Sequence, residues 1–98
     1  MTIDDLIERV RAYNPSAPVE TLRAAYDFSA DKHHGQRRMS GEPYLTHPLQ
    51  VAGIIADMHL DVPSIATGLL HDTVEDTLAT LPQIDELFGN EIATLVDG

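Results

Sequence analysis

The stretch GLLHDTVEDT, residues 68–77, brings four ionisable side chains together within six residues, namely His71, Asp72, Glu75 and Asp76. Carboxylates at this spacing repel one another unless a proton or a cation neutralises them. Residues 67–80 contain no Lys or Arg, so the ion pairs that usually stabilise charged helix faces are missing. Negative charge also disfavours the C-terminal end of a helix. The pattern favours a bound cation, and a solvated acidic helix end is the alternative.

His47 offers a second imidazole to the same site. It precedes Pro48, which stiffens the start of a predicted helix. A helical hairpin can bring that helix start close to the end of the next helix, where His71 and Asp72 stand. Two imidazoles and a carboxylate suit a first-row divalent ion such as Mn, Fe or Zn better than Mg or Ca. For His47 taken alone, a capping or packing role is the alternative.

Gly68 lies one turn before this charged group. A glycine has no Cβ, so it allows another backbone or a ligand to approach the helix closely. We therefore consider two interpretations of Gly68, a close approach that serves the site and a packing contact with a neighbouring helix.

The segment KHHGQRR, residues 32–38, is a basic patch in an acidic chain. It holds three of the six Lys and Arg residues, against 16 Asp and Glu residues and a net charge of −10. Such a charge repels nucleic acid, so binding of nucleic acid is not expected. A phosphate ester would have to be attracted locally, by this patch or by a cation. A solvated loop beside a helix C-terminus is the alternative for the patch.

The apolar periodicity predicts an all-α bundle of about six helices. Their expected starts are Thr2, Pro18, His47, Asp61, Thr80 and the residues after Gly89. Thr80 and Gln83 have the form of a capping box. The helix from Asp61 is expected to reach about Asp76, which spreads the ionisable group over an arc of roughly 140°. The helix from His47 is expected to be largely buried, with Ile54 and Met58 among its apolar residues.

Length and composition indicate one small domain without a membrane anchor. The chain has 98 residues, 43% of them hydrophobic, and no cysteine. No apolar run approaches the roughly 18 residues that a membrane-spanning helix needs. The N-terminal sequence is acidic and amphipathic, unlike a signal peptide. These features predict a cytoplasmic protein.

Three blocks of the sequence resemble a known family. His47 followed by His71-Asp72 is similar to the signature of HD-domain metal-dependent phosphohydrolases. The blocks around it, GQRRMSGEPYLTHPLQVA, GLLHDTVEDT and FGNEIATLVDG, look like the N-terminal hydrolase domain of bifunctional RelA/SpoT homologues. These enzymes make and degrade the alarmone (p)ppGpp. The resemblance covers nearly the whole chain, residues 1–98, and implies an HD-domain helical bundle.

The resemblance also implies roles for single residues. His47, His71 and Asp72 match three ligands of a single Mn2+, and Glu75 and Asp76 match an acidic pair that positions and activates the attacking water. The implied reaction removes the 3′-pyrophosphate of guanosine tetra- or pentaphosphate. Matches to the nucleotide-binding region are Arg38, which would stack on guanine, Met39, Ser40 and, more weakly, Lys32 and His34. Met39 replaces a basic residue of some relatives.

The family pattern predicts that this chain is the first part of a longer domain. The fourth Mn2+ ligand of the family is an Asp in a later helix, beyond residue 98. The bundle is therefore expected to be incomplete on its C-terminal side, with weak metal binding, little or no activity and self-association through exposed apolar faces. Two alternatives remain: another HD-type nucleotide phosphohydrolase, or a non-catalytic helical interaction module.

Overall fold

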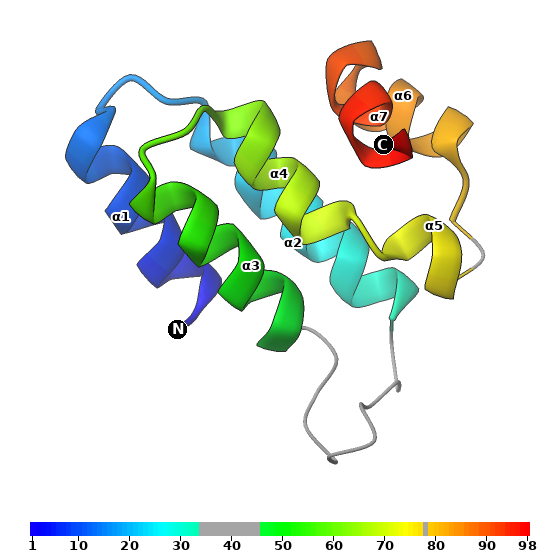
Figure 1. Cartoon of the computed structure of the whole chain (residues 1–98), viewed down its shortest axis with the longest axis horizontal. Coiled ribbons are helices and arrows are strands. Elements are labelled where there is room, and N and C mark those ends of the chain that lie inside the picture. Colours follow the sequence, from blue (N-terminus) through cyan, green and yellow to red (C-terminus); the bar gives the residue numbers. More distant parts are fainter. Residues whose placement is uncertain (34–45, 78) are drawn as a thin grey trace.

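The computed structural model describes residues 1–33, 46–77 and 79–98, and for residues 46, 75 and 76 it describes the backbone alone. Within these ranges every regular element is a helix, which confirms the predicted all-α class. No helix in the described ranges is long and apolar enough to span a membrane. The helices, labelled in Figure 1, are α1 (Ile3–Tyr13), α2 (Val19–Lys32), α3 (Thr46–Asp57), α4 (Val62–Leu70), α5 (Thr73–Asp76), α6 (Leu81–Phe88) and α7 (Asn90–Asp97).

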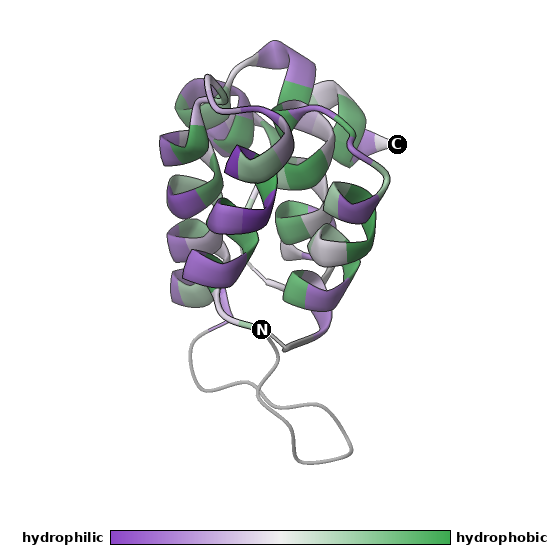
Figure 2. Cartoon of the chain, turned by 90° about the vertical axis from the view of Figure 1, so that its left-hand side faces the viewer, coloured by the Kyte–Doolittle hydropathy of each residue, from purple (hydrophilic) through white to green (hydrophobic). Residues whose placement is uncertain are grey.

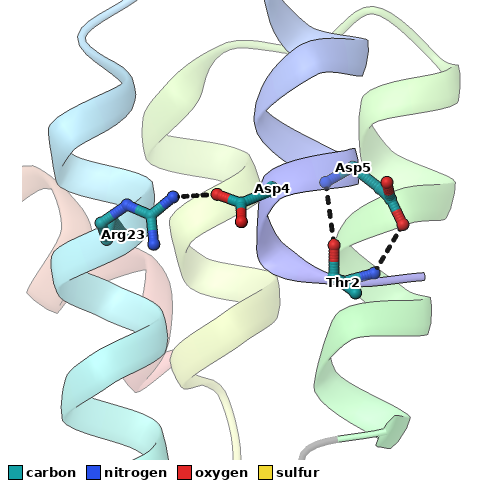
Figure 3. A network of polar contacts seen from close by, with 4 residues as sticks. All are labelled: Thr2, Asp4, Asp5 and Arg23. Atoms are coloured by element: carbon teal, nitrogen blue, oxygen red, sulfur yellow. Dashed lines mark hydrogen bonds and ion pairs between the residues drawn. The ribbon is translucent and has the colours of Figure 1, made fainter.

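Local hydrogen bonds fix where several helices begin. Thr2 caps α1 by accepting from the Asp5 amide, and the Asp5 carboxylate accepts from the Thr2 amide in return (Figure 3). The predicted capping box of Thr80 and Gln83 is present at α6. Each cap satisfies amides that have no partner inside the helix, which explains why sequence alone located these starts.

Helix α4 is the centre of the bundle and packs against α2, α3 and α7. Figure 1 shows α3 and α4 side by side, with α6 and α7 at the other end of the molecule from the N-terminus. Green apolar surfaces of the helices face inward and purple polar ones face outward in Figure 2. Ile65, Leu69 and Leu70 of α4 are almost completely buried, and each such side chain contributes about 1.5–3 kcal/mol on burial.

Two ion pairs connect helix α1 to its neighbours in the bundle. Near its start, Asp4 forms an ion pair with Arg23 of α2 (Figure 3). In the second turn, Arg9 pairs with Asp57 of α3 at 3.1 Å. The apolar residues of α1, including Leu6 and Val10, are buried.

The prediction of one continuous helix from Asp61 to about Asp76 is wrong, because α4 ends at Leu70 and the short α5 begins at Thr73. His71 and Asp72 form a turn between them. Two side-chain contacts accompany the break: His71 Nδ1 lies 2.9 Å from the Gly68 carbonyl oxygen, and Thr73 Oγ1 donates to the Leu70 carbonyl at 2.7 Å. These donors occupy carbonyls that a continuing helix uses for its own amides. The charged residues therefore do not share one helical face.

The sequence predicts that the third helix is largely buried, and its predicted burial of Ile54 and Met58 is wrong. Leu49 and Ala52 are buried, but Ile54 is 61% exposed and Met58 is 59% exposed. Since α3 packs on α1 and α4, its remaining face stays open to solvent in the described part of the chain. The self-association expected from such faces stays a prediction.

Candidate metal centre

The hairpin of α3 and α4 brings together the two segments that the sequence singled out. His47 lies in the first turn of α3, and His71 directly follows α4, so the antiparallel packing of the two helices places both at one end of the hairpin. Asp72 follows in the turn before α5. One potential ligand atom from each of these three residues lies within 4.8 Å of the others. The centre is thus assembled from residues far apart in the sequence.

The three side chains are half-buried and face one another. The imidazole centroids of His47 and His71 are 5.8 Å apart, with their planes inclined by 56°. The Nε2 atom of His71 lies 3.2 Å from Oδ1 of Asp72. The group is therefore partly shielded from water but remains open enough for an ion to reach it.

A backbone carbonyl orients the His71 ring. Since a carbonyl oxygen only accepts hydrogen bonds, the 2.9 Å contact with Gly68 indicates that His71 Nδ1 carries a proton and donates. In the neutral ring, Nε2 then presents its lone pair toward the Asp72 carboxylate. Two acceptors at 3.2 Å require a proton or a cation between them. A buried carbonyl on the outer nitrogen is the usual partner of a metal-binding histidine.

The donor set therefore fits a divalent transition ion. It offers two imidazole nitrogens and one carboxylate oxygen, all at distances that one ion could bridge. Among the described residues, His47, His71 and Asp72 are the group of His, Asp and Glu residues whose potential ligand atoms lie within 4.8 Å of one another. They are the same three that the sequence marked as candidate ligands.

The other predicted site residues divide into three groups. Lys32 ends α2, and its ammonium lies 5.5 Å from the centroid of the Phe28 ring, a contact that holds it along its own helix. The backbones of Glu75 and Asp76 lie in α5, immediately after the candidate metal centre, while their side chains fall outside the described residues. The predicted nucleotide-binding residues His34, Arg38, Met39 and Ser40 also lie outside the described residues.

Sequence reasoning missed two features near the centre. It weighed Gly68 only for its missing side chain, although its carbonyl is a partner of His71. The spacing of three residues between them was the available signal, since side chains reach back to carbonyls at that distance. It also treated His33 as part of an open basic patch, but His33 is only 2% exposed at the end of α2. No local pattern marks this burial.

Comparison of the sequence with known proteins shows which family the chain resembles. Residues 25–98 match the HD domain family. The chain is 54% identical to a GTP pyrophosphokinase of Myxococcus xanthus over 99% of its length, and 45% identical to the bifunctional (p)ppGpp synthase/hydrolase SpoT of Escherichia coli K12 over 97%. A protein named guanosine-3′,5′-bis(diphosphate) 3′-pyrophosphohydrolase in Escherichia coli O157:H7 is also 45% identical. The chain spans only 13–14% of the length of these relatives.

Proposed function

Because the chain belongs to the HD domain family, we propose that it forms the metal-binding part of a hydrolase that removes the 3′-pyrophosphate of guanosine tetra- or pentaphosphate. The observation that carries this proposal is the convergence of His47, His71 and Asp72 within 4.8 Å. The names of the relatives supply the substrate class, since one is a synthase/hydrolase of (p)ppGpp and another is a 3′-pyrophosphohydrolase.

His47, His71 and Asp72 would hold the ion, for which we propose Mn2+, and a further Asp outside this chain would complete its coordination. A divalent ion here supplies a Lewis acid that polarises a phosphoryl oxygen and makes water more acidic. The Gly68 carbonyl keeps the His71 ring in the tautomer that presents Nε2. Partial burial excludes part of the bulk water, which strengthens interactions with a charged substrate.

Glu75 and Asp76 are proposed to accept the proton of the attacking water. They follow the His71-Asp72 pair by one short helix, so their backbone lies next to the ligands. A carboxylate beside an activated water is a suitable general base. Water then cleaves the ester at the 3′ oxygen, and the products are GDP or GTP and pyrophosphate. Arg38, with Met39 and Ser40, is proposed to bind the guanosine, and Lys32 and His34 the phosphates.

A chimera tests the proposal in the context of a whole enzyme. The corresponding segment of the Escherichia coli K12 synthase/hydrolase is replaced by this chain, and release of pyrophosphate from ppGpp is measured with and without Mn2+. We expect Mn2+-dependent hydrolysis, and a loss of at least about 100-fold in Asp72→Asn, because a metal ligand contributes more than its supporting partners do. Synthesis of ppGpp by the same chimera reports that the protein is folded.

Asp57→Asn is the matched control, since Asp57 is also an aspartate at a helix end of the hairpin but lies at the other end, paired with Arg9. It should retain hydrolysis. Full hydrolysis by Asp72→Asn would show that the metal assignment is wrong. A chimera that synthesises ppGpp but hydrolyses only other nucleotides would favour another HD-type phosphohydrolase.

A further inference from the structure

Gly68 lies where α4 packs closely against the backbone of α3. A Cβ atom added to it would lie 3.0 Å from Ile55 Cδ1, and 3.3 and 3.4 Å from Cα and N of Ala52. Both Gly68 and Ala52 are buried. Two of the three contacts are backbone atoms, so we expect a methyl group at position 68 to separate the two helices by a few tenths of an ångström.

The same glycine is linked directly to the candidate ligands. Its carbonyl lies 2.9 Å from Nδ1 of His71, and His71 comes from the helix that the glycine holds in place. Its contact residue Ala52 belongs to the helix that carries His47. One residue therefore acts on both halves of the site, through the separation of the helices and through the tautomer of one imidazole.

We propose that Gly68 is a positioning residue for the metal centre: it sets the distance between His47 and His71 and fixes the direction of the His71 ring. This inference rests on the proposed metal site and adds a determinant of its affinity. Ligand sets tolerate displacements of only about 0.5 Å before binding weakens. A shift of a few tenths of an ångström at position 68 is on this scale.

Gly53 provides a matched control within the same hairpin. It is also buried and helical, in α3, but a Cβ there would meet the flexible end of Met1 and, at 3.6 Å, the Arg9 guanidinium. These groups can move aside. Both Gly→Ala changes raise helix propensity by a similar amount, so a difference between them isolates the contact with α3.

The test is Mn2+ binding by the full 98-residue chain, measured as free Mn2+ by electron paramagnetic resonance. We expect Gly68→Ala to weaken binding about tenfold, as loss of a supporting interaction does. Gly53→Ala should bind as the wild type does. Circular dichroism and melting temperatures identify the temperature at which every variant is fully folded, so that the affinities compare folded proteins.

A second substitution separates helix spacing from general damage. Ile55→Val removes Cδ1, the atom closest to the added Cβ, so Gly68→Ala with Ile55→Val should recover part of the lost affinity. Equal affinities of wild type and Gly68→Ala would overturn the inference and leave the metal site intact. No binding by the wild type, even at the high Mn2+ concentrations that fill a weak site, would overturn the metal site itself. Failure of both Gly68 variants to fold would also overturn the inference, because the contact would then support the fold as a whole.

Discussion

Both ends of the α3–α4 hairpin carry histidine, His59 at the turn and His47 with His71 at the other end, but the imidazoles at the two ends have different surroundings. At the turn, the His59 ring stacks on Tyr13 of α1, with centroids 4.4 Å apart and planes inclined by 14°. The Tyr13 hydroxyl donates to the Leu60 carbonyl at 2.8 Å. At the other end, His47 and His71 direct their rings toward each other and toward Asp72. One end is closed by contacts within the protein, and the other presents converging ligand atoms.

The difference shows how partners, more than residue type, decide the role of a histidine. His59 has a φ of 57°, a left-handed conformation that ordinary side chains adopt at a cost, and the stack with Tyr13 helps to hold it there. Burial raises the pKa of the Tyr13 phenol, and the Asp61 carboxylate raises it further, so Tyr13 remains a donor at neutral pH. The turn is therefore structural. Helix α1, which supplies Tyr13, lies outside the residues that match the HD domain family.

The largest expected effect comes from removing one histidine at each end of the hairpin and measuring both Mn2+ affinity and stability in each variant. His71→Ala should reduce Mn2+ affinity by more than about 100-fold, since even supporting partners cost 10- to 100-fold. His59→Ala should leave Mn2+ affinity unchanged but lower the free energy of unfolding by about 1 kcal/mol, because the aromatic stack is lost. Isothermal titration with Mn2+ and urea unfolding measure the two quantities.

Added Mn2+ should also raise the melting temperature of His59→Ala but not that of His71→Ala, because only a protein that binds the ion is stabilised by it. A loss of the Mn2+ response in His59→Ala would mean that the two ends are coupled, contrary to this comparison.

A smaller effect is expected at Asp61, which caps α4 at the closed end by accepting from the Ser64 amide at 3.0 Å. Hydrogen bonds from the Ser64 hydroxyl and amide lower the pKa of the Asp61 carboxyl below its usual value of 3.8. Asp61→Ala should lower the free energy of unfolding by about 1 kcal/mol near neutral pH. Urea unfolding of the wild type and the variant across a pH series measures this difference.

The pH dependence follows from the lowered pKa. The ionised cap contributes its full stabilisation above pH 3.8, and the contribution disappears as the pH falls through the lower pKa of the folded state. The gap between wild type and Asp61→Ala should therefore close in acid. Asp61→Asn, which can still cap the helix, should be nearly as stable as the wild type at neutral pH. A gap that widens in acid would contradict this account.

The smallest effect is expected for the ion pair of Arg9 and Asp57. Its side chains are 43% and 63% exposed, and exposed pairs contribute about 0.2–1 kcal/mol. Arg9→Gln should lower the free energy of unfolding by an amount near the low end of that range, and high salt should remove most of the difference. Unfolding at low and high salt measures it. An effect as large as that of Asp61→Ala would show that Arg9 contributes through packing as well as charge.

Sequence alone predicted the features that depend on a few neighbouring residues. Thr2, Asp61 and Thr80 begin helices because their side chains accept from amides three positions later. Asn14-Pro15 and Gly89 separate helices for equally local reasons. The all-α class follows from these signals together with apolar periodicity. The sequence blocks around His47 and His71 indicated an HD domain, and the family match over residues 25–98 confirms it.

The tertiary structure decided what depends on contacts between distant residues. The helix expected over residues 61–76 is interrupted at His71 and Asp72, where the side chains of His71 and Thr73 contact the carbonyls of Gly68 and Leu70. The tertiary structure also exposed Ile54 and Met58, although their spacing is that of a buried face. Sequence named His47, His71 and Asp72 as possible ligands, but the packing of α3 against α4 brings their ligand atoms within 4.8 Å of one another. Caps form within one turn of a chain, whereas a binding site requires that two helices pack at one particular separation.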